Sequence, residues 1–168
     1  LAYGRAAEAT PTIRDVPLRQ LVAEQAEMLG LGDGKQPRFE NRVPPELSAP
    51  CDPDQMARVL TNLMRNAIQA LTRAGAEPGD LPVLTVTAGP ENGSVALRII
   101  DNGPGVPERA RANLFQAFRG SVTPGGTGLG LAVAAELVRL HGGSIALEPS
   151  STGAVFAVML PARRANGH

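Results

Sequence analysis

Apolar residues recur at spacings of three and four along several parts of the chain, which is the pattern of a helix with one buried face. The clearest helix start has Asp52 as N-cap, Pro53 at the first helical position and Gln55 at the spacing of a capping box. The apolar stripe that follows predicts a long helix to about residue 73 that faces a core. Shorter helices are expected over 17–29, over 108–118 and over 130–140.

Four other segments alternate apolar residues with polar or small ones, as strands with one buried face do. They are 83–88, 94–100, 144–148 and 154–160, and a short strand is expected over 38–43. Asn92-Gly93, between the first two, is a strong hairpin signal. Because the strands follow one another in hairpins, the fold class predicted is α+β: a two-layer α/β sandwich with a mixed, mostly antiparallel sheet and helices on one face.

The length of 168 residues is that of one ordinary domain, since a chain of this size buries about 70% of its unfolded surface. Residues 17–161 are expected to form this domain. Residues 1–16 are expected to be the end of a preceding element and a connecting arm outside the core, and residues 162–168 a polar tail.

Composition narrows the classes of function. With 43% hydrophobic and 19% charged residues, the sequence is neither that of a disordered chain nor that of a membrane-spanning one. Sixteen basic residues balance sixteen acidic ones, and four Phe, one Tyr and no Trp offer little for base stacking, so nucleic acid is not an expected partner. The single cysteine, Cys51, excludes an internal disulfide and favours a cytoplasmic location.

The first candidate for chemistry is the pair Asn62 and Asn66, four residues apart at the edge of the long helix's apolar stripe. Asparagine is a mediocre helix former, so a polar ligand against this face would account for the pair. An amide oxygen is a hard, neutral ligand that suits Mg²⁺, and Arg65 and Gln69 on the same edge could meet phosphates. A solvated helix face explains the same pattern equally well.

The second candidate is Asp101-Asn102-Gly103-Pro104-Gly105, which follows an apolar strand. A carboxylate that leaves a buried strand is placed to accept a hydrogen bond from an amine deep in a pocket, such as the exocyclic amine of adenine. The two glycines let the backbone approach a flat ligand closely. An ordinary Asp-Asn-Gly turn, with its own side-chain-to-backbone hydrogen bond, is the competing interpretation.

The third candidate is the glycine-rich run that ends at Gly130 and opens an apolar helix. Backbone N–H groups at a helix N-terminus, with no Cβ atoms in the way, form an anion site suited to a polyphosphate. The spacing is neither that of a P-loop nor that of a dinucleotide fingerprint. A flexible hinge loop is the alternative, and the Gly-, Ser-, Thr- and Pro-rich stretch at 119–125 suggests a mobile lid.

In this order the three candidates resemble the catalytic ATP-binding domain of bacterial sensor histidine kinases, within the superfamily of gyrase, Hsp90 and MutL and its Bergerat-type ATP-binding fold. The resemblance covers roughly residues 17–161. The matching motifs are 62–66 for the N box, 101–105 for the first glycine box, 114–118 for the F box and 126–131 for the second glycine box. His141-Gly142-Gly143 and residues 156–161 also look like the corresponding parts of these kinases.

The resemblance implies a binding role for the residues that match. Asn66 is expected to coordinate Mg²⁺, and Asp101 to accept a hydrogen bond from the adenine amine. Gly103 and Gly105 are expected to shape the base pocket, together with Val106. The other nucleotide-binding candidates are Asn62, Gln69, Phe118, Gly126, Thr127, Gly128, Leu129 and Gly130.

The resemblance also implies which residues take part in catalysis. Arg119, just after the F box, is expected to reach the γ-phosphate, and Asn62 and Arg65 are the other catalytic candidates. ATP-hydrolysing relatives have a glutamate as general base at the position of Asn62, which cannot accept a proton at neutral pH. A site that positions ATP without activating water suits phosphoryl transfer to a protein side chain.

The chain is therefore expected to be the catalytic domain of a protein-histidine kinase, which donates the γ-phosphate of Mg-ATP to a histidine in two-component signal transduction. Its own histidines are His141 and His168. His141 ends a helix and is expected to be structural, with a favourable charge there when protonated, and His168 lies in the tail. The acceptor is expected on a separate dimerisation hairpin, whose last turn residues 1–5 resemble, so the chain alone is not expected to autophosphorylate.

The partners implied are that dimerisation and phosphoacceptor hairpin and the receiver domain of a response regulator. The chain itself is expected to be a monomer and the full-length protein a homodimer, either cytoplasmic or the cytoplasmic part of a membrane-bound sensor. A non-catalytic scaffold of the same fold and an ATP-hydrolysing relative are the alternatives. Loss of the nucleotide-binding motifs would indicate the first, and Asn62 argues against the second.

Overall fold

The computed structural model describes residues 8–74, 81–116 and 129–162. Its strands are β1 (Arg14–Pro17), β2 (Arg38–Asn41), β3 (Ser48–Cys51), β4 (Val83–Glu91), β5 (Ser94–Asp101), β6 (Ser144–Glu148) and β7 (Ala154–Pro161). Five of them form one sheet in the order β2-β4-β5-β7-β6, and β1 pairs with β3 in a small separate sheet. β2 runs parallel to β4, whereas the other neighbours in the large sheet are antiparallel.

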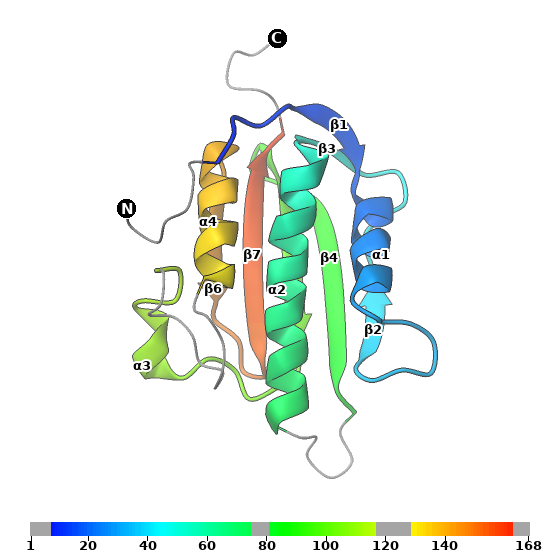
Figure 1. Ribbon diagram of the computed structural model, residues 1–168, viewed down its shortest axis with the longest axis vertical. Coiled ribbons are helices and arrows are strands. Elements are labelled where there is room, and N and C mark those ends of the chain that lie inside the picture. The colour runs from blue at the N-terminus through cyan, green and yellow to red at the C-terminus, as the bar shows by residue number, and fades with distance from the viewer. Residues whose placement is uncertain (1–7, 75–80, 117–128, 163–168) are drawn as a thin grey trace.

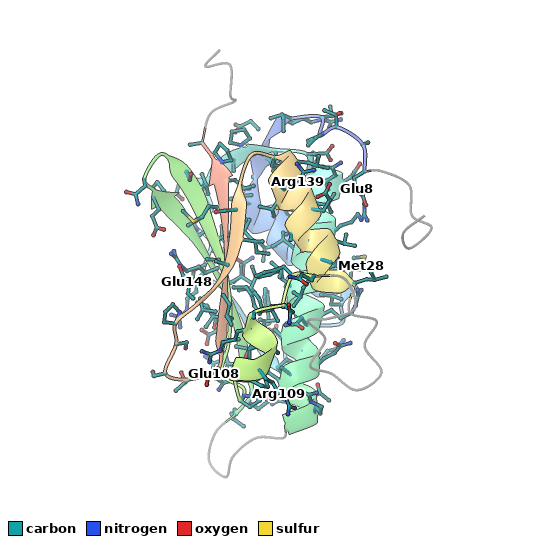
Figure 2. The ribbon with its side chains drawn as sticks, turned by 90° about the vertical axis from the view of Figure 1, so that its left-hand side faces the viewer. Glu8, Met28, Glu108, Arg109, Arg139 and Glu148 are labelled. Atoms are coloured by element: carbon teal, nitrogen blue, oxygen red, sulfur yellow. The ribbon has the colours of Figure 1, made fainter. Side chains whose placement is uncertain are left out.

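The helices lie on one face of the large sheet. They are α1 (Leu18–Met28), α2 (Pro53–Ala74), α3 (Glu108–Arg111) and α4 (Gly130–Leu140). Figure 1 shows α1, α2 and α4 side by side in front of the strands. The view turned by 90° shows α2 and α4 on one side of the sheet, with α3, which carries the labelled Glu108 and Arg109, near the lower end (Figure 2). The expected two-layer sandwich with a mixed, mostly antiparallel sheet is confirmed.

The core lies between α2 and the sheet. The apolar stripe of α2 is buried from Met56 to Leu71, except for Ile68, which is half-buried. It belongs to one hydrophobic cluster with Leu97 of β5 and Phe156 of β7. Full burial of a Leu or Phe side chain contributes about 1.5–3 kcal/mol, so this stripe fixes how α2 is turned on the sheet and which of its edges is left for polar residues.

Two features differ from the sequence-based expectation. β1 and β3 were not expected, because each has only four residues, each contains a proline, and neither has a clear alternation. Val16 lies opposite Ala49 in this pair and is only 7% exposed, so the expectation that residues up to 16 lie outside the core is wrong for Val16. The helix expected over 108–118 is shorter, because α3 ends at Arg111 and turns follow as far as residue 116.

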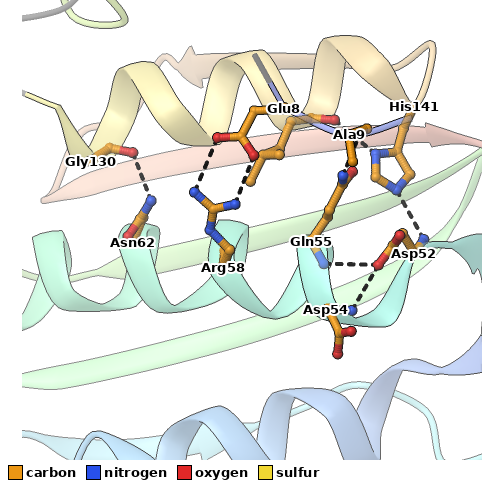
Figure 3. Close-up of polar contacts among 10 residues, drawn as sticks. Glu8, Ala9, Asp52, Asp54, Gln55, Arg58, Asn62, Gly130 and His141 are labelled. Carbon is orange, nitrogen blue, oxygen red and sulfur yellow. Dashed lines mark hydrogen bonds and ion pairs between the residues drawn. The ribbon is translucent and has the colours of Figure 1, made fainter. Parts of the chain in front are cut away.

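The start of α2 holds the segment that precedes β1 (Figure 3). Asp52 is the N-cap, as expected: its Oδ1 accepts hydrogen bonds from the N–H groups of Asp54 and Gln55 at 3.0 and 3.1 Å. Its Oδ2 accepts from the N–H of Thr12 at 2.9 Å. Burial alone would raise the pKa of Asp52, but these three N–H groups stabilise the carboxylate and hold that pKa below its ordinary value.

Only half of the expected capping box forms, because the Gln55 N–H donates to Asp52 Oδ1 but the Gln55 side chain does not return the bond. Instead of reaching back to Asp52, the side chain of Gln55 donates to the carbonyl of Ala9 at 2.8 Å. Arg58, one turn further along, forms an ion pair with Glu8 at 2.9 Å. The polar side chains of this first part of α2 therefore bind the incoming chain rather than close the helix end.

The N–H of Asp52 that a capping box would have used donates to His141 Nε2 at 3.0 Å instead. His141 Nδ1 lies 2.8 Å from the carbonyl oxygen of Leu137. A carbonyl can only accept and a backbone N–H can only donate, so in this arrangement Nδ1 donates and Nε2 accepts. The structural role expected for His141 is confirmed, because these two hydrogen bonds tie the end of α4 to the start of α2.

Candidate nucleotide site

Four elements, α2, α4, β5 and β7, meet away from the end of the molecule that holds the Asp52 N-cap. Asp101 ends β5 and pairs with Ala154 at the start of β7. The middle of α2 carries Asn62 and Asn66, and α4 begins beside it. Asn62 Nδ2 donates to the carbonyl of Gly130 at 3.1 Å, which fixes the first turn of α4 to α2 (Figure 3). The structure thus brings the first and second sequence candidates to one region, along with the last residues of the third.

Asp101 is the buried charge of this region, only 3% exposed. Its Oδ1 accepts hydrogen bonds from the N–H of Gly103 at 2.9 Å and from the N–H of Ala154 at 3.3 Å. Burial raises the pKa of Asp101, and the two N–H groups oppose this rise. Oδ2 accepts no hydrogen bond within the described part of the chain, so one carboxyl oxygen is fixed and the other is left to accept.

The two interpretations of the Asp-Asn-Gly sequence are both partly right. The bond from the Gly103 N–H to Asp101 is the one that an ordinary turn of this kind forms. An ordinary turn, however, does not bury its carboxyl or receive a second N–H from another strand. The second N–H comes from Ala154, at the start of β7.

Gly153 is a site residue that the sequence analysis missed. A Cβ on Gly153 would lie 1.8 Å from the carbonyl oxygen of Asp101, and φ is +65°. Gly105 lies against the same residue, since its own Cβ would be 3.2 Å from the Gly153 carbonyl oxygen. Gly103 is close to the Asp101 side chain, with a Cβ distance of 3.1 Å to Oδ1. Only the three-dimensional contact identifies Gly153, because in the sequence it is one more glycine in a turn.

The polar residues of α2 have different surroundings. Asn62 and Asn66 are both half-buried at the edge of the stripe, as expected, whereas Arg65 and Gln69 are exposed. Asn62 is engaged with Gly130, and Asn66 forms no hydrogen bond with any residue that the structure describes. Among the described residues nothing occupies the Asn66 amide, which leaves it available for a ligand.

The F box and the second glycine box are only partly visible. Leu114 is buried, and the ring of Phe115 meets that of Phe156 edge to face with centroids 6.0 Å apart. Leu129 and Gly130 are half-buried at the start of α4, and Val106 is half-buried in the loop after β5. The remaining candidates, Phe118, Arg119, Gly126, Thr127 and Gly128, lie outside the described residues.

Comparison with known proteins gives a consistent answer. Residues 51–164 match the family described as histidine kinase-, DNA gyrase B-, and HSP90-like ATPase. The sensory histidine kinase/phosphatase NtrB of Klebsiella oxytoca is 40% identical over 127 residues, which are 71% of this chain and 35% of NtrB. Full-length ShkA, solved in complex with AMPPNP, has a TM-score of 0.73 at 25% identity and covers 95% of this chain and 33% of ShkA. The catalytic domain of the histidine kinase ThkA has the same fold, with a TM-score of 0.72 at 24% identity over 89% of this chain and 95% of that domain.

The chain belongs to this family of histidine kinase-, gyrase B- and HSP90-like ATPases, and within it to the catalytic ATP-binding domains of sensor histidine kinases. It spans about a third of the length of NtrB, at 35%. Among the described residues, no helix is both long and apolar enough to cross a membrane.

Proposed function

We propose that this chain binds Mg-ATP and positions it for transfer of the γ-phosphate to a histidine on a separate dimerisation and phosphoacceptor segment. The observation that carries the proposal is the buried carboxyl of Asp101. Its Oδ1 accepts hydrogen bonds from two N–H groups, whereas its Oδ2 accepts none from the described residues. Such an acceptor suits the exocyclic amine of adenine, and the charge-assisted bond would contribute roughly 1.5–3 kcal/mol. The AMPPNP complex of the similar kinase ShkA supports a nucleotide at this fold.

The residues present fit Mg²⁺ bound together with a nucleotide. The described part of the chain has no group of three His, Cys, Asp or Glu that could hold a metal by itself. Mg²⁺ typically takes one or two protein oxygens and completes its shell with phosphate oxygens and water. Asn66, whose amide oxygen accepts no hydrogen bond from the described part of the chain, is the proposed protein ligand. Bound there, the ion would neutralise charge on the phosphates.

The proposed reaction is transfer to a protein side chain rather than to water. Asn62 stands where a hydrolytic relative needs a base, yet an amide cannot accept a proton at neutral pH. Its Nδ2 is also committed to the Gly130 carbonyl at 3.1 Å, so its role here is to hold the start of α4 against α2. Arg119, Arg65 and Gln69 remain the proposed phosphate contacts.

The wider setting follows from the same proposal. The partners would be the phosphoacceptor hairpin and the receiver domain of a response regulator, with this chain monomeric and the full-length protein a cytoplasmic or cytoplasm-facing homodimer. Residues 17–161 would be the catalytic domain, residues 1–16 its connecting arm and residues 162–168 a tail.

A calorimetric titration with a non-hydrolysable ATP analogue, with and without Mg²⁺, tests the proposal. Asp101→Asn should weaken binding by on the order of 2 kcal/mol, about 30-fold, because an amide can present a donor to the adenine amine. Asn66→Ala should remove the Mg²⁺ dependence. Asp54→Asn removes one exposed carboxylate of the same helix and should change neither quantity.

Four results would contradict this function. Unchanged affinity in Asp101→Asn would remove Asp101 from the base site, and a Mg²⁺ dependence that survives Asn66→Ala would place the metal elsewhere. No binding at millimolar nucleotide by the folded chain would favour the scaffold alternative. Steady phosphate release from the chain without an acceptor would favour an ATP-hydrolysing enzyme.

A further inference from the structure

Next to the site, the side chain of Asn102 takes the place of a backbone pair in the ladder between β4 and β5. The β4–β5 ladder ends where Leu84 lies opposite Asp101, so a further rung would pair Val83 with Asn102. There the main chain leaves the sheet, and the Asn102 carboxamide takes its place. Its Oδ1 accepts from the Val83 N–H at 2.8 Å, and its Nδ2 donates to the Leu81 carbonyl at 2.8 Å. A carboxamide has the same donor and acceptor as a peptide group, so it can complete the ladder while the backbone turns away.

The strand to which Asn102 is tied is itself fixed. On the other side of β4, the N–H of Arg38 donates to the carbonyl of Pro82 at 2.9 Å, just before β2 pairs with β4. Residues 81–83 are therefore bonded from both sides, by the main chain of β2 and by the side chain of Asn102. The loop after β5 is thus attached to the sheet rather than to another loop.

The opposite side of the same peptide is also held. Gly153 approaches so closely that its Cβ would lie 2.9 Å from the Cα of Asn102, and the next residue, Ala154, donates its N–H to Asp101 Oδ1 at 3.3 Å. The peptide that joins Asp101 to Asn102 is therefore held from one side by β4 and from the other by residues 153–154. Removing the two hydrogen bonds of the Asn102 side chain would release this peptide from β4.

We propose that Asn102 is a positioning residue for the nucleotide. By completing the hydrogen bonding of the sheet, its side chain holds Asp101 in place. Oδ1 of Asp101 then keeps its hydrogen bonds to the two N–H groups, and Oδ2 is available to the base. This inference rests on the proposed function, because it assumes that Asp101 meets the adenine amine. It assigns Asn102 no contact with the nucleotide.

The test compares ATP with inosine triphosphate, which carries a carbonyl oxygen in place of the exocyclic amine. The unmodified chain should bind ATP more tightly by roughly 10- to 100-fold, the value of one charge-assisted hydrogen bond. Asn102→Ala should lower the ATP affinity by about tenfold and leave the inosine triphosphate affinity nearly unchanged. The reason is that only the hydrogen bond from the adenine amine depends on the orientation of the Asp101 carboxyl. The ratio of the two affinities is therefore the readout that loss of stability alone would not move.

Asn41→Ala is the matched control. The Asn41 side chain makes the same two kinds of bond, accepting from the Val43 N–H at 3.2 Å and donating to the Arg19 carbonyl at 3.1 Å, but it joins β2 to α1 and has no link to Asp101. It should lower the melting temperature by a comparable amount and leave the affinity ratio unchanged. If Asn102→Ala does not fold, Asn102→Leu keeps the branched side-chain shape without either bond and gives the same readout.

The outcomes separate the two claims. An unmodified chain that prefers ATP and a variant that loses this preference support the positioning role. A preference that survives both Asn102 variants, or an equal loss of both affinities, overturns the positioning role and leaves the proposed function standing. An unmodified chain without any preference for ATP overturns the adenine contact itself, and the positioning role with it.

Discussion

Replacement of Gly153 by alanine tests how tightly the two strand ends enclose Asp101. The new Cβ would lie 1.8 Å from the Asp101 carbonyl oxygen and 2.7 Å from its carbonyl carbon. Both are backbone atoms, so no side-chain rotation relieves the collision, and the main chain at 101 or 153 has to move. The first bond at risk is the one from the Ala154 N–H to Asp101 Oδ1, at 3.3 Å.

The expected cost has two parts. The left-handed φ of +65° alone costs an alanine about 1–2 kcal/mol. Loss of a hydrogen bond to a buried carboxyl adds about 1–3 kcal/mol. The matched control is Gly93→Ala, in the β4–β5 turn, where φ is +79° but a Cβ would meet nothing within 4 Å. It should therefore cost only the first part.

Urea unfolding of both variants measures this difference, and ATP titration of the folded proteins measures its effect on the site. Gly153→Ala should be less stable than Gly93→Ala by about 1–3 kcal/mol and should bind ATP at least several-fold more weakly. Gly93→Ala should bind ATP like the unmodified chain. Equal stabilities, together with equal ATP affinities, would refute the reasoning that the 153–154 backbone holds Asp101 in place.

Two further predictions concern groups outside the site. Asp52→Ala should cost about 1 kcal/mol at pH 7 through loss of the N-cap. Since the pKa of Asp52 is lowered in the folded state, its contribution is present above the unfolded pKa and lost as pH falls through the folded pKa, so the difference between the variant and the unmodified chain in urea unfolding should shrink below about pH 4. Cys51 is fully buried, and burial, with Asp52 and Asp15 nearby, raises its pKa to about 12. A thiol reagent at pH 8 should therefore label Cys51 only in urea, and fast labelling of the native chain would contradict its burial.

The long elements were predictable because their signals are local. The N-cap Asp52, the helix start at Pro53 and the stripe that follows all lie within one continuous segment, and the structure confirms each. The Asn92-Gly93 turn is equally local: both residues have the positive φ that this hairpin requires. The side-chain half of the capping box did not form, because the Gln55 side chain donates instead to Ala9, which is distant in sequence.

The candidate site was predictable only in part. The sequence motif identifies Asp101 as a possible acceptor, but its burial and its second N–H depend on β7, which pairs with β5 from more than fifty residues away. The roles of Gly153 and Asn102 arise from the same long-range pairing, and neither has a periodic signal. β1 and β3 were missed for a related reason, since four-residue strands that contain proline are stabilised by each other and by the core rather than by their own sequence.

A crystal structure of this chain with a non-hydrolysable ATP analogue and Mg²⁺ tests the central claim most directly. The account predicts the exocyclic amine of adenine within hydrogen-bond distance of Asp101 Oδ2, with Oδ1 still on the Gly103 and Ala154 N–H groups and the ion on the amide oxygen of Asn66. A nucleotide bound elsewhere, or an adenine that does not contact Asp101, would contradict it.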